Sequence, residues 1–136
     1  MIIEFRHVGI VVNDLEKAMW FYHKVLGLEI IVKERLSKEY SEKLFKKYLD
    51  LTFVKFKPSL EIYYFHNKKS KSKNKDFRHF ALTVTDIEKL WKKLHNLGFM
   101  CYNKPISDAQ AKHSLFFTRD PFGNLIEFVE EIGSWK

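Results

Sequence analysis

Two segments of the chain alternate in side-chain character with the period of a β-strand. They read FRHVGIVV at residues 5–12 and FRHFALTV at residues 77–84. Successive side chains of a strand point to opposite faces, so His7, Gly9 and Val11 share one face of the first segment and its larger apolar residues the other. We therefore predict a strand at each place, with its histidine on the face turned away from the core.

A helical pattern follows each of these strands. Apolar residues recur at intervals of three or four over residues 15–26 and 87–97, which is the spacing of one helix face. Gly27 and Gly98 are predicted to end the two helices. Short polar residues that can cap free amide groups stand just before each helix, and the candidates are Asn13 or Asp14 and Thr85 or Asp86.

Strand character returns after each helix. The first half continues with LEIIVKE (28–34), LTFVKF (51–56) and LEIYYF (60–65), and the second half with FMCYN (99–103), SLFFTR (114–119) and NLIEFVE (124–130). Residues 36–50 interrupt the first half and carry Tyr40, Leu44 and Tyr48 at helical spacing, which predicts a short extra helix. Residues 104–113 are predicted to form a polar loop, and residues 120–124, DPFGN, a tight turn.

The two halves are copies of one plan. Seven of the thirteen residue pairs formed between residues 5–17 and 77–89 are identical, including both histidines. An internal repeat of this kind fixes the architecture before any single element is considered. We predict an α+β fold with two βαβββ modules in tandem within one domain of residues 1–136. Module one covers residues 1–67, a basic linker 68–75, module two 76–131 and a tail 132–136.

Composition and charge limit the class of protein. The chain has 136 residues, of which 46% are hydrophobic and 16% aromatic, enough to fill a core of this size. Its net charge of +7 raises the possibility of nucleic-acid binding, but five lysines are concentrated in residues 68–75 with no aromatic residue among them, which favours a solvated connector over a phosphate-binding patch. No apolar run is long enough to span a bilayer, and Cys101 is the single cysteine, so we expect a cytoplasmic protein.

One histidine and one glutamate recur in each module. His7 and His79 lie on the first strands, and Glu61 and Glu127 lie on the last strands among large apolar residues. A lone strand histidine is more often a hydrogen-bonded residue than a ligand, and a lone strand glutamate more often faces solvent. Because the set is duplicated, packing of the two modules about a pseudo-twofold axis would bring four donors together. Two imidazoles and two carboxylates suit one divalent ion, with Zn or Ni favoured and Co, Mn or Fe possible alternatives.

The pattern resembles the vicinal-oxygen-chelate superfamily, which includes glyoxalase I, methylmalonyl-CoA epimerase, extradiol dioxygenases, fosfomycin-resistance thiol transferases and bleomycin-binding proteins. The segments that carry the resemblance span nearly the whole chain and are residues 6–30, LEIYYF, RHFALTV and DPFGNLIEFVE. The resemblance implies a mostly antiparallel, U-shaped sheet cup, a divalent metal, a small-molecule substrate and a homodimer. It gives no reason to expect a nucleic-acid or membrane partner.

Within the superfamily, a His, Glu, His, Glu set is similar to that of glyoxalase I and is carried here by His7, Glu61, His79 and Glu127. The epimerases usually place glutamine at the position of Glu61, and the dioxygenases use two histidines and one glutamate for iron. Bacterial glyoxalase I has an arginine at the position of Val11 and an asparagine at that of Phe65, and both serve glutathione. The apolar residues at these positions cannot supply those contacts.

The resemblance implies a lyase or isomerase that acts on a 2-oxo or hydroxy-carbonyl compound through an enediolate. Glu127, or alternatively Glu61, would move the proton. The cup is expected to be lined by Val11, Tyr63, Phe65, Thr83 and Phe117, with Arg119 as an anchor for an anionic substrate. An extradiol-type dioxygenase and a non-catalytic antibiotic-binding resistance module remain alternatives. The site is formed either within one chain or across a dimer.

Overall fold

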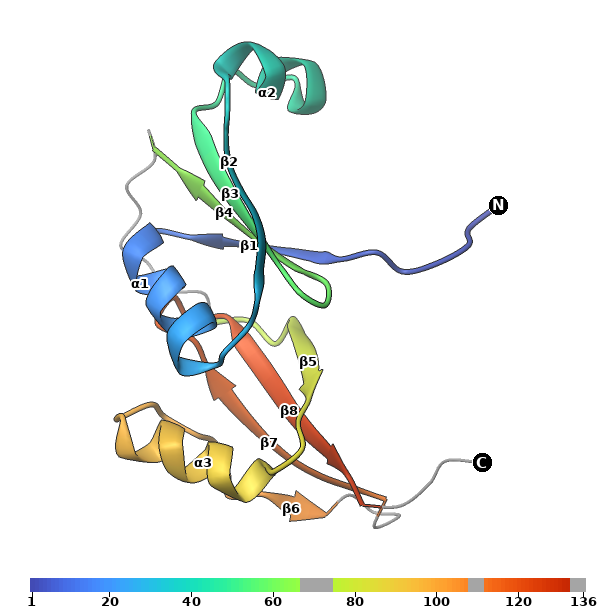
Figure 1. Cartoon of the computed structure of the whole chain (residues 1–136), viewed down its shortest axis with the longest axis vertical. Helices are drawn as coiled ribbons and strands as arrows, with labels where there is room; N and C mark the ends of the chain where they lie inside the picture. The colour runs from blue at the N-terminus through green and yellow to red at the C-terminus, as the bar shows by residue number, and fades with distance from the viewer. Residues whose placement is uncertain (67–74, 108–111, 133–136) are drawn as a thin grey trace. The chain divides into compact units, whose positions relative to one another are not determined.

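The structure, a computed structural model, consists of two compact units, Met1–Ser72 and Lys73–Lys136 (Figure 1). It describes residues 1–66, 75–107 and 112–132. The predicted basic linker therefore lies outside the described residues except for Lys75, and the predicted tail except for Ile132.

The first unit contains a four-stranded sheet in the order β1-β4-β3-β2. Its strands are β1 (Val8–Val12), β2 (Ile30–Leu36), β3 (Leu51–Phe56) and β4 (Leu60–Phe65). β1 runs parallel to β4, while β4 with β3 and β3 with β2 are antiparallel. The chain therefore returns from the far edge of the sheet to place its last strand beside its first.

The second unit repeats this topology in the order β5-β8-β7-β6. Its strands are β5 (His79–Thr83), β6 (Ile106–Ser107), β7 (His113–Arg119) and β8 (Leu125–Glu131). β5 is parallel to β8, and the other two pairings are antiparallel. The predicted α+β class and the duplicated strand plan are confirmed, and each sheet is mixed because its first and last strands run parallel.

The helices begin where the acidic caps predicted them. Asp14 accepts from the amide of Lys17 at 3.0 Å and starts α1 (Leu15–Met19), and Asp86 accepts from the amide of Lys89 at 3.1 Å and starts α3 (Ile87–Asn96). Gly27 and Gly98 end the helical segments with φ of +75° and +87°, conformations that favour glycine. No helix among the described residues is long and apolar enough to cross a membrane.

The first helix differs from the prediction in its second half. α1 continues directly into η1 (Trp20–Val25), a π-helix, in which the amide of Leu26 donates to the carbonyl of Phe21. The wider turn keeps Phe21, Tyr22 and Val25 buried. The Tyr22 ring lies 6.0 Å from that of Phe56 on β3, centroid to centroid, and so connects the helix to its sheet.

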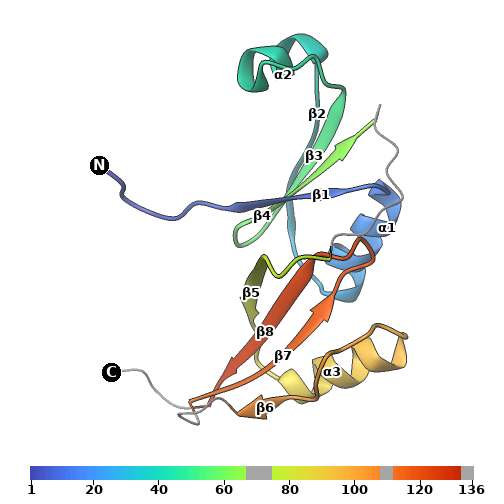
Figure 2. The same cartoon turned by 180° about the vertical axis from the view of Figure 1, so that it is seen from behind.

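The predicted extra helix is α2 (Lys38–Phe45), at the end of β2 and β3 away from α1 (Figure 2). Its apolar stripe does not form its buried face, because Tyr40, Leu44 and Tyr48 are about half exposed. The buried residue is Ser41, whose hydroxyl accepts from the amide of Leu49 at 2.8 Å and lies within hydrogen-bonding distance of three carbonyl oxygens. A hydroxyl group therefore anchors this insertion.

The prediction of a strand over residues 99–103 is wrong. Only Cys101 forms an isolated bridge, to Thr118, and the short edge strand β6 lies inside the predicted loop. Asn103 explains the shift, because its side chain donates to the carbonyl of Leu115 at 3.2 Å and accepts from the amide of Phe117 at 3.3 Å. The side-chain amide takes the place of a strand backbone along β7.

Each sheet has one face in the core and one face that carries polar residues. In the first unit the core face includes Val54 and Phe56 of β3 and Leu60 and Ile62 of β4, all buried. In the second unit Phe116 and Phe128 stack at 5.2 Å, with Ile126 fully buried in the same unit. The predicted site residues occupy the alternate positions of these strands.

Candidate functional site

In the first unit, a candidate His–Glu pair joins the residue before β1 to the second residue of β4. His7 immediately precedes β1, and Glu61 is on β4 opposite Gly9 in the parallel register. His7 Nε2 and Glu61 Oε2 form an ion-pair contact. The glutamate side chain is only 9% exposed, while that of the histidine is 35% exposed, so the carboxylate is buried beneath the imidazole.

Glu61 Oε2 is a buried carboxylate oxygen with no hydrogen-bond partner among the residues that the structure describes, and its close neighbour is His7 Nε2. Burying an ionised oxygen without a hydrogen bond is unfavourable, and bound cations are a common way in which proteins compensate for it. Lys55 on β3 is directly opposite Glu61 in the register and half-buried, so a positive charge also lies on this face. The buried oxygen fits a cation-binding role for Glu61, whereas Lys55 is an alternative source of positive charge for the same carboxylate.

The second unit holds a His–Glu pair of the same composition. His79 is on β5 and Glu127 is on β8 opposite Ala81, and His79 Nε2 lies 3.3 Å from Glu127 Oε2. His79 Nδ1 lies 2.9 Å from the carbonyl oxygen of Phe77. Both ring nitrogens of His79 thus face acceptor oxygens, the Phe77 carbonyl at Nδ1 and the Glu127 carboxylate at Nε2.

Each unit thus brings together one predicted histidine and one predicted glutamate. Among residues 1–66, 75–107 and 112–132, no group of three or more His, Cys, Asp or Glu side chains forms a potential metal site. The binding of one ion by all four residues, two from each unit, therefore stays a prediction. The donor types themselves, neutral imidazole nitrogen and carboxylate oxygen, fit Zn and the other divalent ions expected from the sequence.

Three of the predicted lining residues share the face of Glu61. Val11 is opposite Tyr63 in the register, and Phe65 follows on the same face of β4. The Tyr63 ring stacks on that of Phe53 at 6.2 Å, and burial followed by the charge of Glu61 raises the pKa of the Tyr63 phenol.

Gly9 leaves the space that the Tyr63 ring occupies. A Cβ atom at Gly9 would lie 2.8 Å from Tyr63 Cε2, closer than carbon atoms approach one another. The sequence pattern placed Gly9 on this face but gave it no role, and it missed Phe53. The alternation of LTFVKF beside LEIYYF is the signal that could have identified Phe53.

The lining residues predicted in the second unit share the face of Glu127. Phe117 on β7 is directly opposite Glu127, and Thr83 is at the end of β5 on the same face. The Phe117 ring packs edge-on against the His79 imidazole with centroids 5.4 Å apart. The aromatic ring therefore limits rotation of the imidazole.

Arg119 lies at the end of β7 and makes its contacts within the second unit. Its Nε donates to the hydroxyl of Tyr102 at 2.7 Å, and its Nη1 donates to the carbonyls of Gly123 at 2.7 Å and Asp76 at 3.1 Å. These bonds use most of its donors, whereas the sequence predicted an anchor for an anionic substrate. That role stays a prediction.

The turn after Arg119 fixes the start of β8 and so the place of Glu127. Asp120 is buried and accepts from the amides of Phe122 and Asn124, both at 2.8 Å, and from the Asn124 side chain at 2.9 Å. Gly123 has φ of +86° in this turn. The predicted tight turn over residues 120–124 is confirmed.

The sequence matches one known family along most of its length. The model of the Glyoxalase/Bleomycin resistance protein/Dioxygenase superfamily matches residues 4–128. This range includes all four of the predicted metal ligands.

Two of the proteins to which the chain is similar differ in their activities. It is 26% identical over 131 residues to lactoylglutathione lyase GLX1 of Arabidopsis thaliana, covering 93% of the chain and 44% of the plant protein. It is 29% identical over 124 residues to metallothiol transferase FosB of Lysinibacillus sphaericus, covering 90% of the chain and 78% of that protein. The chain thus spans less than half the length of the plant lyase.

Solved structures show the same fold. A glyoxalase family protein from Bacillus cereus matches with a TM-score of 0.82 at 19% identity, covering 98% of this chain and 97% of that one. One from Enterococcus faecalis matches with a TM-score of 0.65 at 21% identity, covering 93% of this chain and 97% of that one. These similarities support the duplicated βαβββ architecture.

Proposed function

Since the chain belongs to the Glyoxalase/Bleomycin resistance protein/Dioxygenase superfamily, we propose that it is a metal-dependent enzyme of the lyase or isomerase type. Its substrate is a small compound with oxygens on neighbouring carbons, such as a 2-oxo or hydroxy-carbonyl compound. The reaction consists of moving a proton from one carbon to the next.

The observation that carries this proposal is the pairing of one histidine with one glutamate in each unit, together with a buried oxygen of Glu61 that accepts no hydrogen bond from the described part of the chain. We assign His7, Glu61, His79 and Glu127 as the ligands of one divalent ion, with Zn and Ni favoured. When bound, the ion supplies Lewis acidity that lowers the energy of negative charge on the substrate oxygens.

Glu127 is the better candidate for the base. Its side chain is 21% exposed, against 9% for Glu61, so substrate can reach it more readily. It would take the proton from the carbon beside the substrate carbonyl and return it to the neighbouring carbon. Glu61 is less accessible to substrate because its side chain is buried beneath His7, so we assign it only the role of a metal ligand.

The lining residues favour a compact apolar or aromatic substrate. Tyr63 and Phe53 offer stacked rings in the first unit, and Phe117 offers a third in the second. Val11 and Phe65 have no donors for a peptide-like thiol, so we propose that glutathione is not recognised as it is by bacterial glyoxalase I.

A second candidate is a metal-dependent thiol transferase. The similarity to FosB covers 78% of that enzyme, whereas the similarity to the plant lyase covers less than half of it. The same donor set would serve, but the thiol sulfur would bond to an electrophilic carbon of the substrate as the bond from that carbon to an oxygen breaks, and the thiol proton would pass to that oxygen. Product analysis separates the two candidates, because the transferase gives a thioether, whereas the isomerisation of a hemithioacetal formed from a thiol and a 2-oxo compound gives a thioester.

A homodimer is consistent with the proposal, because each unit supplies only half of the ligand set. The partner half comes either from the second unit of the same chain or from a second copy. Mixing a variant that lacks His7 with one that lacks His79 tests this, since activity recovers on mixing only if sites are shared between chains.

The test of the proposed function is the pair of variants Glu61→Gln and Glu127→Gln. Glu130→Gln is the matched control, because Glu130 is on β8 at an alternate position that faces away from Glu127. Titration of untagged, metal-free protein with Zn²⁺ and Ni²⁺ should show affinity reduced by at least about tenfold in both test variants. Turnover of methylglyoxal mixed with a series of thiols should be lost in Glu127→Gln and kept in the control. Unchanged metal affinity and turnover in both test variants would refute the proposal.

A further inference from the structure

A lysine lies on the same face of the first sheet as the His7–Glu61 pair. Lys55 is on β3, directly opposite Glu61 of β4 on one side and Val32 of β2 on the other. Residues directly opposite one another on paired strands share a face of the sheet, so the lysine is a neighbour of the glutamate there. Its side chain is half-buried, although lysine is among the residues that are rarely covered unless they are paired.

The ammonium group of Lys55 has no partner in the part of the chain that the structure describes. No carboxylate oxygen there lies within 4.0 Å of it, and it donates no hydrogen bond there. Opposite residues have Cβ atoms about 4.5–5.5 Å apart, which a lysine side chain can span, so Glu61 is within reach but contacts His7 instead. In this part of the chain the fully buried polar side-chain atoms without a partner belong to Glu61 and Trp91, so the Lys55 nitrogen is open to a ligand.

The surroundings of Lys55 on this face are largely apolar. Phe53 lies two residues away on β3, and its ring stacks on that of Tyr63 at 6.2 Å. Glu34 is opposite Phe53 on β2, but it is exposed and does not pair with the lysine. A charge that is partly removed from water attracts an opposite charge more strongly than one in bulk solvent. This face can therefore hold an aromatic body on the rings and an anionic group on the lysine.

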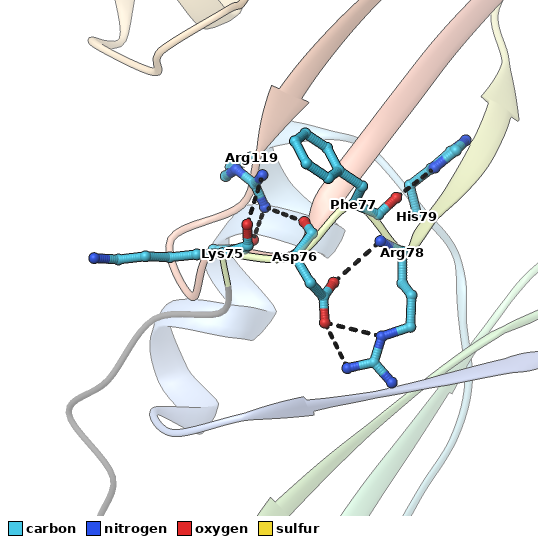
Figure 3. A network of polar contacts seen from close by, with 7 residues as sticks. Lys75, Asp76, Phe77, Arg78, His79 and Arg119 are labelled. Carbon is cyan, nitrogen blue, oxygen red and sulfur yellow. Dashed lines mark hydrogen bonds and ion pairs between the residues drawn. The ribbon is translucent and has the colours of Figure 1, made fainter.

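Arg119, the anchor for an anionic substrate that the sequence predicted, already has partners. Figure 3 shows its guanidinium beside the main chain that leads into β5, where it donates to the carbonyl of Asp76 at 3.1 Å and to that of Lys75 at 3.5 Å. It also donates to a carbonyl and to a hydroxyl of the second unit, both at 2.7 Å. Binding an anion there would compete with these bonds, whereas Lys55 has no bond to the described part of the chain to give up.

We propose that Lys55 determines specificity for an anionic substrate: its ammonium group binds a carboxylate that the substrate carries apart from its two neighbouring oxygens. The substrate class is then a small aromatic or apolar compound with one such carboxylate. The ammonium is a compact point charge, which matches a group with a single negative charge. The requirement for neighbouring oxygens rests on the proposed function, while the binding of the carboxylate by Lys55 needs no metal.

The test compares two probes, 3,4-dihydroxybenzoate and its methyl ester. Both have neighbouring oxygens on an aromatic ring, and only the acid carries a carboxylate charge at neutral pH. Binding of each to metal-free protein is measured by NMR chemical-shift titration at low ionic strength. A hydrogen bond to a charged group changes affinity by about tenfold or more, so the unchanged protein should bind the acid at least about tenfold more tightly than the ester. Equal affinities would overturn the proposal and leave Lys55 as a countercharge for Glu61.

Lys55→Met and Lys55→Gln remove the charge and keep most of the side-chain length. Each should bind the acid and the ester about equally, with the affinity for the ester unchanged. Lys33→Met is the matched control, because Lys33 is an exposed residue of β2 opposite Val54, on the other face of the same sheet. It should keep the preference for the acid. A folded Lys55 variant that keeps the preference, or a Lys33 variant that loses it, would overturn the proposal.

Zn²⁺ titration of the unchanged protein separates this proposal from the proposed function. If the unchanged protein binds no Zn²⁺, the proposed function fails. The comparison of acid and ester in metal-free protein still decides the role of Lys55, because it depends only on the charge of the probe and the charge of the side chain.

Discussion

The contact between Gly9 and Tyr63 yields the most detailed prediction, which concerns the variant Gly9→Ala. The added Cβ would lie 2.8 Å from Tyr63 Cε2, whereas carbon atoms in ordinary contact are about 3.5–4.0 Å apart. The ring must therefore retreat by roughly 1 Å from β1. Because Phe53 stacks on Tyr63 and limits where that ring can go, part of the displacement is passed to this neighbour.

The expected cost follows from two opposing effects. Overpacking by one methyl group destabilises a protein by about 1–3 kcal/mol. Replacing glycine by alanine where the backbone permits it stabilises by about 0.4–1 kcal/mol through the unfolded state, and Gly9 does not have positive φ. The net effect on the free energy of unfolding is then a loss of about 0–2.6 kcal/mol, while catalysis should suffer more because a misplacement of about 1 Å can cost about 100-fold in rate.

Urea denaturation of a double-mutant cycle isolates the contact. In a Tyr63→Ala background the ring is absent, so Gly9→Ala should become neutral or stabilising by about 0.4–1 kcal/mol. The difference between the two backgrounds measures the Gly9–Tyr63 contact. An equal cost of Gly9→Ala with and without the ring would refute the steric explanation.

Two further predictions concern stability and pH. Ser41→Ala should lower the free energy of unfolding in urea by about 1–3 kcal/mol, because it removes both the hydrogen bond that the buried hydroxyl accepts from the Leu49 amide and one that it donates to a nearby carbonyl oxygen, at about 0.5–1.5 kcal/mol each, and a change below about 0.5 kcal/mol would contradict this. The pKa of Tyr63, read from the absorbance difference between the unchanged protein and Tyr63→Phe, should lie above the usual phenol value, and Glu61→Gln should lower it only in part because burial is the larger cause. Since folding raises this pKa, the contribution of Tyr63 to stability is present below about pH 10 and lost as pH rises through the raised pKa, so a contribution that instead grows with pH would contradict the assignment.

Much of the fold could be predicted because both copies of the repeat contain local sequence patterns, namely strand alternation and helix caps. Alternation located β3 and β4 at the residues found, since both strands have one face in the core and one face toward the site. Asp14 and Asp86 marked the helix starts through a local hydrogen bond that needs no tertiary information.

The predictions that were wrong concern features that depend on contacts between residues distant in the sequence. The side chain of Asn103 replaces a strand that composition alone indicated, and a buried hydroxyl at Ser41 decides which face of α2 packs. Neither partner of these bonds is visible in the spacing of the sequence.

The candidate site was predictable to the level of each His–Glu pair. Duplication identified His7 with Glu61 and His79 with Glu127, and the register places each pair side by side. The contacts of Arg119 were not predictable, because most of them are to main-chain carbonyls, which the sequence does not distinguish.

X-ray absorption spectroscopy of the zinc-loaded protein tests the central claim most directly, because it counts the ligands of the metal by type. The account predicts two imidazole nitrogens at about 2.0–2.1 Å together with carboxylate oxygens, and one imidazole fewer in each of His7→Ala and His79→Ala. A coordination shell with no imidazole, or one that keeps both imidazoles in either variant, would contradict it.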